Sequence, residues 1–554
     1  MADPSVKIIF LGGLGEVGRN CACIEVNGRL IMVDCGVLFP ELDMLGIDLV
    51  LPDFSFVREN AHRLAGLVLT HGHEDHIGAI AYLLRNVDSL DIYGSPLAIE
   101  FARGRVVEHG LSGRANFIAV RDNEIRDIGA VRVEFIPVTH SVPEAFALAI
   151  HTPLGVVLHT GDFKIDHTPV DGRKTNLARI GEIASTVGVK LLLSDSTKAE
   201  EPGFSDSESS IKQSLGDVIT QHPGRVIAAS FASHIHRIQQ LADVAVDSGR
   251  YIAVLGRSMK RNISIARQLG ALKIPEDRLI DIEQTEGLRP REVLVVSTGS
   301  QGEPMSALSL MAAGENRWIT LYEDDLVLLS SHAVPGNETA VGRVIDKLMR
   351  KGVRVVHSGI AKVHVSGHGR QGDLSTMMSV ARPQNMIPVH GEYRHMWHNA
   401  ELAMRMGLPE SNVLICQDGD VVELTDSTIA VVDKVPAGYT YVDGTVGDVV
   451  EEVIRDRQVL AEEGLVVLVL TVDAKSGKIL YGPEIVTKGW IHAPEAEELL
   501  DEARQAVTAA LEGIETEGVY DPEIFRRRAR RALGKFVAER TRRRPMIVPV
   551  VTEV

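Results

Sequence analysis

Short apolar runs separated by polar and turn residues fill about the first 200 positions of the chain. Runs of four to eight residues rich in Val, Ile and Leu predict β-strands. They occupy residues 7–11, 21–26, 29–33, 67–70, 131–138, 156–159 and 190–193. Helical patterns lie between some of these runs, for example at residues 77–84, so this region predicts a mixed α/β domain.

A second block, residues 207–347, alternates strand and helix patterns. Its clearest helix is expected at 235–246, and its apolar runs are 225–230, 251–255, 292–297 and 326–330. Such alternation is typical of βαβ units, so the block predicts a small domain built on a parallel sheet.

A link containing Pro and Gly follows residue 425, and the last hundred or so residues predict a separate α+β unit. Its expected elements are a hairpin around 473–477, a helix at 493–511, a basic helix at 522–540 and a strand at 546–551.

Length and composition indicate a globular protein of several domains. The chain has 554 residues, which suggests three or four core-forming units. Its 45% hydrophobic and 24% charged residues exclude a disordered chain. No apolar run approaches the ~20 residues that span a bilayer, and the run 465–470 is strand-sized. No membrane association is therefore expected.

The first residues lack a basic and apolar leader pattern, and the four cysteines do not form a disulfide framework. Both features predict a reduced, cytoplasmic protein. The net charge of −17 argues against general binding of polyanions. It does not exclude a nucleic-acid substrate, because bound divalent ions and a locally basic groove can supply the field that phosphate needs.

The densest group of candidate ligands is Thr70-His71-Gly72-His73-Glu74-Asp75-His76, directly after an apolar strand pattern. Imidazole and carboxylate together suit Zn²⁺ or Mn²⁺. His71 and His73 alternate by two and can point to one side of a turn, whereas Asp75 and His76 can reach a second ion. A solvated His-rich loop is the simpler alternative, but three His and one Asp directly after a strand favour a metal site.

A second motif, Gly13-Leu14-Gly15-Glu16-Val17-Gly18, fits the glycine pattern of dinucleotide-binding proteins. That fingerprint requires a helix next, so that the pyrophosphate meets its N-terminus. Here residues 21–26 predict another strand, which argues against nucleotide binding.

Other candidate ligands share the context of the opening motif, because each follows an apolar strand. They are His140 after 135–139, Asp162 after 156–161 and His390 after 386–389. Any one of them alone would be read as a core or loop residue. Four such strand ends are better explained by one site at the rim of a sheet.

These motifs resemble the metallo-β-lactamase fold, an αββα sandwich, and specifically its nucleic-acid-processing β-CASP branch. The resemblance implies that His71, His73 and His140 hold one ion, that Asp75, His76 and His390 hold a second, and that Asp162 bridges the two. Asp34, in the segment 30–36, matches an aspartate that supports the site without binding metal.

The β-CASP branch is indicated by Asp195 after a strand, by His368 in a Gly/Ser setting and by His390 about twenty residues later. Within this branch the sequence is most similar to the ribonuclease J family. The segments 11–20 and 298–304 and the trailing domain support this resemblance. The expected organisation is a metallo-β-lactamase core at 1–205 and 346–425, an inserted β-CASP α/β domain at 206–345, a linker at 426–450 and a C-terminal α+β domain at 451–554.

The resemblance implies a metal-dependent ribonuclease that uses a pair of ions at ~3.5–4 Å to generate hydroxide and to bind phosphate. Asp75 would help to position the nucleophile, and His368, oriented by Asp195, would protonate the leaving 3′ oxygen. The implied activity is 5′→3′ exonucleolytic with a preference for 5′-monophosphate ends, together with endonuclease activity, in rRNA processing and mRNA decay.

Single-stranded RNA would be held by small residues and backbone N–H groups of two segments. They are Ala232, Ser233 and His234 in the inserted domain, and His364, Val365, Ser366, Gly367 and His368 in the core. His234 stands where many relatives are expected to carry Asn.

The family also implies a homodimer or tetramer, protein partners in RNA decay and a structural Ca²⁺ for which Asp48 and Asp443 are candidates. The basic helix at 522–540 has two readings: an RNA contact, or a solvent-facing helix that pairs with the acidic stretch 495–502.

Several alternatives are weighed against this reading. A ribonuclease Z-like tRNA 3′-end endonuclease is the nearest, but no specificity arm is evident. A di-iron oxidoreductase of the same fold would typically carry Glu in place of His73, and a β-lactamase or glyoxalase would lack Asp195 and His368. An RNA-binding scaffold without catalysis is disfavoured because every expected ligand is present.

Overall fold

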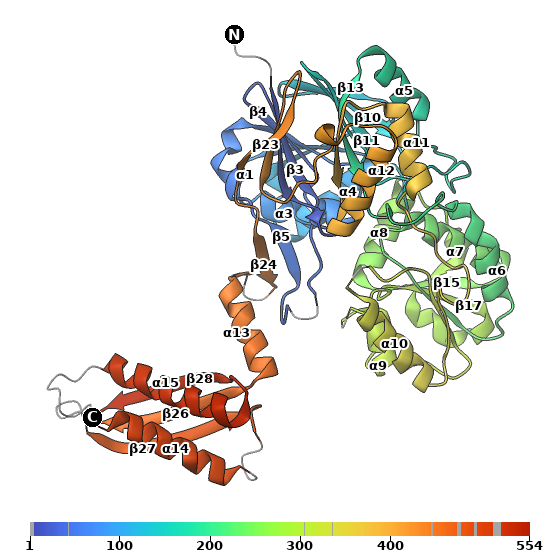
Figure 1. Ribbon diagram of the computed structural model, residues 1–554. Helices are drawn as coiled ribbons and strands as arrows, with labels where there is room; N and C mark the ends of the chain where they lie inside the picture. The colour runs from blue at the N-terminus through green and yellow to red at the C-terminus, as the bar shows by residue number, and fades with distance from the viewer. Residues whose placement is uncertain are drawn as a thin grey trace. The chain divides into compact units, whose positions relative to one another are not determined.

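The computed structural model describes residues 5–41, 44–303, 305–334, 336–444, 447–473, 478–491, 496–512 and 522–554. The chain forms two compact units (Figure 1). The larger comprises Met1–Phe39 and Leu49–Thr440, and the smaller comprises Pro40–Asp48 and Tyr441–Val554.

Two sheets face each other in the core of the larger unit. The first has the order β23-β22-β1-β3-β4-β6-β7-β8 and the second the order β20-β13-β12-β11-β10-β9. The strands of the first are β23 (Ile429–Lys434), β22 (Asp420–Leu424), β1 (Val6–Gly12), β3 (Cys21–Val26), β4 (Arg29–Val33), β6 (Leu64–Val68), β7 (Leu90–Gly94) and β8 (Ala115–Ala119). Those of the second are β20 (Asn385–Val389), β13 (Val189–Asp195), β12 (Gly155–His159), β11 (Phe146–Thr152), β10 (Val131–Pro137) and β9 (Ile125–Ile128).

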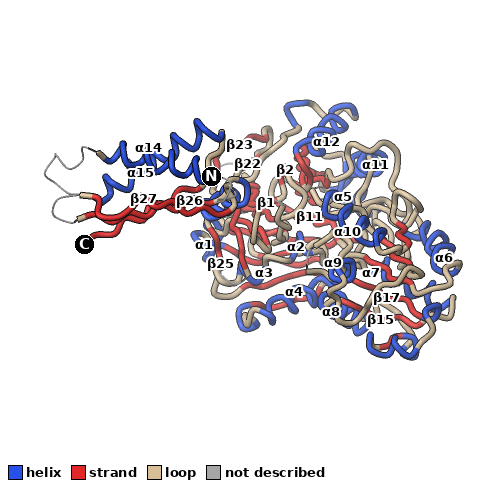
Figure 2. Tube along the Cα trace, turned by 90° about the horizontal axis from the view of Figure 1, so that it is seen from below, coloured by secondary structure: helices blue, strands red, loops and turns tan. Residues whose placement is uncertain are grey.

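Side chains of both sheets share one apolar core. Ile8 and Ile24 of the first sheet pack in the same buried cluster as Val133 and Leu148 of the second. The opposite face of the second sheet packs against helices α5 (Leu177–Thr186), α11 (Gln371–Ala381) and α12 (Tyr393–Arg405). Helix α4 (Pro96–Glu108) contacts β7 and β8 of the first sheet. The predicted αββα sandwich is thereby confirmed (Figure 2).

The inserted segment folds around a parallel sheet of order β16-β15-β17-β14-β18-β19. Its strands are β14 (Val226–Ala229), β15 (Tyr251–Leu255), β16 (Leu279–Ile280), β17 (Val293–Ser297), β18 (Leu326–Leu329) and β19 (Arg354–Val356). Its helices are α6 (Lys212–Thr220), α7 (Ile235–Asp247), α8 (Arg257–Gln268), α9 (Ala307–Ala313) and α10 (Glu338–Arg350). The expected βαβ alternation is therefore present.

The structure differs in detail from two expectations and agrees with a third. The helix expected at 77–84 is two short helices, α2 (Glu74–Ile77) and α3 (Ile80–Leu83), because the backbone turns at Gly78 and Ala79. The expected linker contains β23 and the hairpin of β24 (Tyr439–Asp443) and β25 (Gly447–Val449). The glycine motif contains the short strand β2 (Leu14–Gly15) and is followed by β3, as expected for a chain without a dinucleotide fingerprint.

In the smaller unit, helix α13 (Glu451–Glu462) precedes a sheet of order β27-β26-β28. The strands are β26 (Leu465–Val472), β27 (Ile479–Lys488) and β28 (Met546–Glu553). Helices α14 (Glu497–Leu511) and α15 (Pro522–Thr541) pack on one face of the sheet through Val507, Leu533 and Val537. The turn expected at 474–477 and the start of the helix expected at 493 lie outside the described residues.

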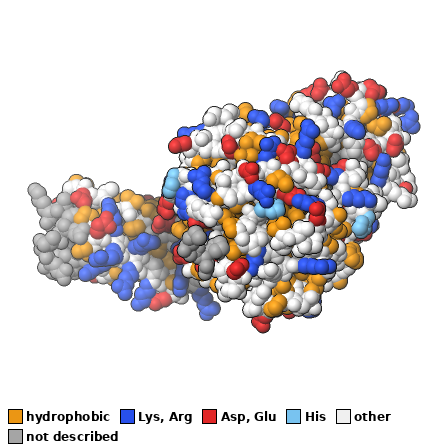
Figure 3. Space-filling model, turned by 90° about the horizontal axis from the view of Figure 1, so that it is seen from above, with side chains coloured by type: hydrophobic (Ala, Val, Ile, Leu, Met, Phe, Trp, Pro, Cys, Tyr) orange, Lys and Arg blue, Asp and Glu red, His pale blue; other side chains and the backbone are white. Residues whose placement is uncertain are grey.

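Among the described residues, none of the helices has the length and apolar character that a bilayer span requires. Acidic and basic side chains are interspersed over the face drawn in Figure 3. All four cysteines are buried free thiols, as the absence of a disulfide framework predicted.

Candidate metal centre

The loop between β6 and α2 carries the opening motif. His71 is fully buried, whereas His73 is partly exposed. The chain packs tightly here: a Cβ atom at Gly36 would lie 1.6 Å from the carbonyl oxygen of Asp75. The amide of Asn20 donates to the same oxygen at 3.0 Å. The turn that presents Asp75 is therefore held by backbone contacts with two other segments.

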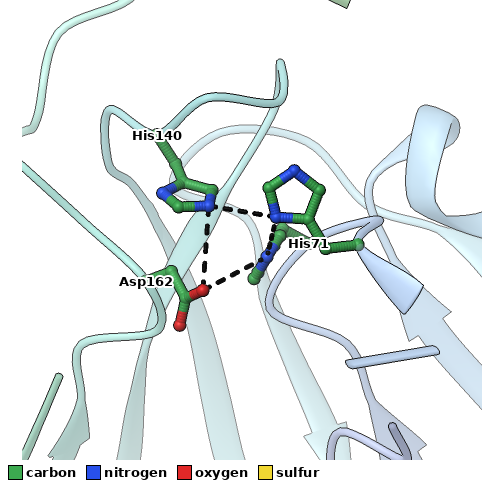
Figure 4. Close-up of side chains that lie close together, drawn as sticks. His71, His140 and Asp162 are labelled. Atoms are coloured by element: carbon green, nitrogen blue, oxygen red, sulfur yellow. Dashed lines mark hydrogen bonds and ion pairs between the residues drawn. The ribbon is translucent and has the colours of Figure 1, made fainter. Parts of the chain in front are cut away.

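Two groups of ligand atoms lie side by side at the rim between the sheets, each with its atoms within 4.8 Å of one another. The first contains His71, His73, His140 and Asp162, and the second contains Asp75, His76, Asp162 and His390. Figure 4 shows His71, His140 and Asp162 converging from separate segments. Asp162 belongs to both groups, as expected for a carboxylate between two cations.

The distances within the first group suit a shared cation. His73 Nδ1 lies 3.0 Å from His71 Nε2 and 3.1 Å from His140 Nε2. Asp162 Oδ2 lies 3.6 Å from His71 Nε2 and 3.7 Å from His140 Nε2. Three imidazole nitrogens that converge on one carboxylate oxygen form the kind of donor set that zinc and manganese bind.

In the second group, His76 Nε2 lies 3.2 Å from Asp162 Oδ2 and 3.5 Å from Asp75 Oδ2. His390 Nε2 is 3.6 Å from Asp75 Oδ2. This nitrogen is buried and makes no hydrogen bond within the described part of the chain. A buried polar atom without a partner is costly, and a cation in this group would satisfy it. The residues present therefore fit a metal centre.

The imidazoles are oriented by partners behind them. His76 Nδ1 contacts Asp34 Oδ2 at 2.7 Å, and His140 Nδ1 contacts the carbonyl oxygen of Gly367 at 2.9 Å. Asp34 in turn accepts hydrogen bonds from the amide and the hydroxyl of Thr70, each at 2.8 Å. Such contacts fix the tautomer that leaves the other ring nitrogen available to a metal.

Burial sets the charge of the cluster. It lowers the pKa of His71 and His140 well below the usual value, and that of His73 to about 4. These rings are therefore neutral at pH 7, as metal ligands must be. Burial alone would raise the pKa of Asp162, but His390 and the other neighbouring imidazoles hold it well below the usual value.

His368 lies beside the cluster, and its Nδ1 is 2.8 Å from Oδ2 of Asp195. Its Nε2 is 3.9 Å from Asp162 Oδ2, and its ring centroid is 5.0 Å from that of His140. Burial alone would lower the pKa of His368, but Asp195 and Asp162 outweigh it and raise the pKa to about 9. At neutral pH the ring therefore carries a proton that it can donate.

A second histidine cluster lies where the inserted domain meets the segment 363–368. His234, at the start of α7, has its ring centroid 6.1 Å from that of His364. Arg237 is fully buried and donates to the carbonyl oxygens of Ser330 and Val363 and to Glu208. Sequence reasoning named His234 and His364 but missed Arg237, Glu208 and Ser330, which it had no means of placing beside them.

The remaining expected RNA contacts line the same two segments. Ala232 and Ser233 are partly exposed before α7, and the carbonyl of Ala232 accepts from Asn262. Ser366 Oγ accepts from the amide of His368, and the buried Lys164 Nζ donates to the Ser366 carbonyl at 3.1 Å. Val365 and Gly367 are the neighbours of Ser366 in the chain.

The two candidate calcium ligands belong to the smaller unit. Asp48 Oδ2 accepts from the amide of Gly444 at 2.7 Å, and Asp443 Oδ2 pairs with Arg457 at 2.9 Å. A guanidinium already neutralises Asp443, so the calcium site stays a prediction from sequence.

The fold and the cluster define a metallo-hydrolase of the metallo-β-lactamase superfamily, and comparisons with known proteins agree. The Metallo-beta-lactamase superfamily matches residues 14–209, and the Zn-dependent metallo-hydrolase RNA specificity domain matches 352–415. The beta-CASP domain of ribonuclease J matches 223–348, and its C-terminal domain matches 452–554.

Curated relatives match along nearly the whole chain. Ribonuclease J of Corynebacterium glutamicum is 42% identical over 99% of this chain and 76% of its own length. Ribonuclease J of Mycobacterium tuberculosis is 42% identical over 100% of this chain and 98% of its own length. Ribonuclease J2 of Bacillus subtilis is 36% identical over 99% of this chain and 99% of its own length. A solved structure from Enterococcus faecalis, titled a protein of unknown function, matches 76% of this chain and 100% of its own with a TM-score of 0.54. At 17% identity it shows the fold alone.

The chain belongs to the ribonuclease J family. It is therefore a ribonuclease, a hydrolase that binds RNA and divalent metal ions. Matches to both ribonuclease J domains select this family over the ribonuclease Z-like and di-iron alternatives.

Proposed function

We propose that the protein degrades single-stranded RNA from the 5′ end, prefers a 5′-monophosphate and can also cut internally, by means of two divalent cations. The observation that carries the proposal is the loop 364–368, which connects the second histidine cluster to the metal centre. His368 is four positions after His364, so their Cα atoms are at most about 14 Å apart. A terminal phosphate held at His364 would keep the reacting phosphodiester within a few nucleotides of the 5′ end.

His71, His73, His140 and Asp162 would hold one cation, and Asp75, His76, His390 and Asp162 the other. When bound, such a pair lowers the pKa of water and offsets the charge of a phosphate oxygen. Zinc and manganese both suit this ligand set, since affinity favours zinc while metal supply decides occupancy in a cell.

His368 would donate its proton to the leaving 3′ oxygen, because its Nε2 faces the bridging Asp162 while Asp195 holds Nδ1. The products would be a 5′-phosphate and a 3′-hydroxyl. Asp34 would keep His76 in the tautomer that leaves Nε2 available.

The second histidine cluster would bind the 5′-terminal phosphate. Burial lowers the pKa of His234 to about 4 although the neighbouring Glu208 acts in the opposite direction, and burial next to Arg237 lowers that of His364 well below the usual value. Both rings are neutral N–H donors at pH 7. Backbone N–H groups of 232–234 and 364–368 would complete the pocket.

The proposal extends to a homodimer or tetramer. On the sheet of the smaller unit, Val467 lies between Val486 and Val548 on adjacent strands. Val486 is 45% exposed, and Val548 and Val550 are each 39% exposed, on the face away from α14 and α15. A contiguous apolar surface of this kind favours burial against a second copy. RNA maturation and decay in the cytoplasm, with protein partners, would be the setting.

The test compares 5′-monophosphorylated, 5′-triphosphorylated and 5′-hydroxyl RNA of one sequence, with Mn²⁺ or Zn²⁺ added. Wild type should release mononucleotides stepwise from the monophosphorylated substrate, and Asp75→Ala and His368→Ala should not. Asp122→Asn, at an exposed ion pair with Arg173, serves as the control. Equal turnover by wild type and both active-site variants would contradict the proposal.

A further inference from the structure

A third histidine, His332, extends the cluster formed by His234 and His364. It follows β18 in the inserted domain, and its ring lies edge-on to that of His364 with centroids 4.7 Å apart at 89°. The three rings form a row that begins at the buried Glu208 and Arg237 and ends at the exposed His332. Neither the motif comparison nor the established activity assigns His332 a role.

The ring of His332 is held in one orientation. Its Nδ1 is 3.0 Å from the hydroxyl of Ser358, a residue that follows β19. Within the described residues, its Nε2 makes no hydrogen bond. In the tautomer in which Nδ1 accepts from the Ser358 hydroxyl, the proton of the neutral ring lies on Nε2, and this atom is then a donor available to a ligand.

The backbone of His332 is clamped by Gln301, in the segment 298–304. Gln301 is 5% exposed; its Nε2 donates to the His332 carbonyl, and its Oε1 accepts from the amide of Val334, both at 2.8 Å. One side-chain amide therefore fixes the chain on both sides of residue 333. Rigid support of this kind is what a recognition residue requires, because it removes the cost of ordering a loop on binding.

Basic and acidic groups both lie near the three rings. Burial lowers the pKa of His332, Lys198 and Arg237 lower it further, and Glu201 acts in the opposite direction. The guanidinium of Arg237 pairs with the buried carboxylate of Glu208 at 2.8 Å and lies 3.4 Å from His364 Nδ1, so it also holds the ring of His364 in place. A phosphate oxygen is a strong hydrogen-bond acceptor, so a neutral N–H donor in this cluster suits a phosphate group.

We propose that His332 is a specificity-determining residue that donates a hydrogen bond from Nε2 to the 5′-terminal phosphate of the RNA, with Gln301 as its positioning residue. This inference rests on the proposed function, because it names a further contact of the same phosphate pocket. The proposal gives Gln301 a role that the metal chemistry does not explain.

The test uses full-length protein and two RNAs of one sequence, one with a 5′-monophosphate and one with a 5′-hydroxyl. His332→Phe keeps an aromatic ring without a donor, and His332→Gln keeps an N–H donor near the position of Nε2. The Phe variant should raise KM for the monophosphorylated RNA roughly 10-fold, the cost of one hydrogen bond to a charged group, and leave the hydroxyl RNA unchanged. The Gln variant should retain most of the wild-type preference.

Gln301→Ala should reduce the preference in the same direction, and His62→Gln, at an exposed histidine of the 3-10 helix Ala61–Arg63, should have no effect. The melting temperature of every variant is also measured, so that an effect caused by the lost hydrogen bond can be distinguished from an effect caused by unfolding. If the Phe variant keeps the preference while the Gln variant loses it, the ring acts by stacking and the inference is wrong. If both retain the wild-type ratio, it is also wrong. If wild type itself ignores the 5′ group, the proposed 5′ preference fails first, and the inference with it.

Discussion

Replacing Asp34 by Asn should weaken metal binding without changing the shape of the site. The side chain is 1% exposed and the backbone has φ +58°, a conformation that Asn tolerates better than most residues. Asn can keep both contacts with Thr70, because a hydroxyl can accept as well as donate. Only the contact with His76 Nδ1, at 2.7 Å, changes, because the carboxylate oxygen that accepts there is replaced by an amide NH₂ that donates.

In wild type, the carboxylate of Asp34 accepts the Nδ1 proton of His76, and Nε2 keeps its lone pair toward Asp75 and Asp162. An amide NH₂ in the same place would force Nδ1 to accept, which moves the proton to Nε2. The variant loses one hydrogen bond to a charged group, about 1.5–3 kcal/mol. That range corresponds to a fall in metal affinity of roughly 10- to 100-fold, the usual effect of removing such a partner.

The assay is calorimetric titration of the metal-free protein with Mn²⁺, repeated with Zn²⁺ in competition with a chelator. Asp122→Asn removes the same charge from an exposed ion pair and should bind like wild type. The melting temperature of the metal-free variant should stay near that of wild type, because the substitution changes the tautomer of His76 and removes one charge but leaves the packing unchanged. An affinity of Asp34→Asn within twofold of wild type would refute the role given to Asp34.

Three further predictions concern protonation and packing. Burial holds the pKa of His234 at about 4 against about 6.5 when unfolded, so this residue makes the free energy of unfolding fall by about 1–3 kcal/mol as pH falls from 6.5 to 4. Denaturant titrations across that range should show a shallower fall for His234→Asn, and an unchanged slope would contradict this. Burial alone would lower the pKa of His368, but the adjacent carboxylates raise it to about 9. Asp195→Asn should therefore move the alkaline limb of the kcat/KM profile to lower pH, and a limb that stays in place would exclude His368 as the acid. Gly36→Ala should cost about 3 kcal/mol of unfolding free energy and abolish metal binding, because its methyl group would collide with the Asp75 carbonyl. Normal metal content in a folded Gly36→Ala protein would show that the turn can relax.

The strand-end pattern predicted which side chains would meet. His140, Asp162 and His390 each follow a strand of the second sheet, and strand ends at one rim bring distant residues together. The β3 strand was likewise predicted from the apolar pattern at residues 21–26, whereas the two-residue strand β2, inside the glycine motif, was not.

The supporting contacts could not be predicted from sequence. Arg237 reads as an ordinary helix residue, and only the crossing of α7 with the segment after β19 brings it to the carbonyl of Val363. The break between α2 and α3 depends on Gly78, where a Cβ would lie 2.6 Å from the Glu74 carbonyl oxygen. His332 could have been noticed in the sequence, because it follows the apolar run 326–330 in the same way that His390 follows 386–389.

The distribution of the ligands along the chain has a consequence for how the protein is made. His71, His73, His140 and Asp162 leave the ribosome in the first third of synthesis, whereas the contact of Asp162 with His390 spans 228 positions. At roughly 5–20 residues per second, the nascent chain carries the complete first set for about 10–50 s before the last ligand of the second set appears. Cation capture should therefore be sequential, and the first ion would already be in place while the β-CASP segment is still being translated.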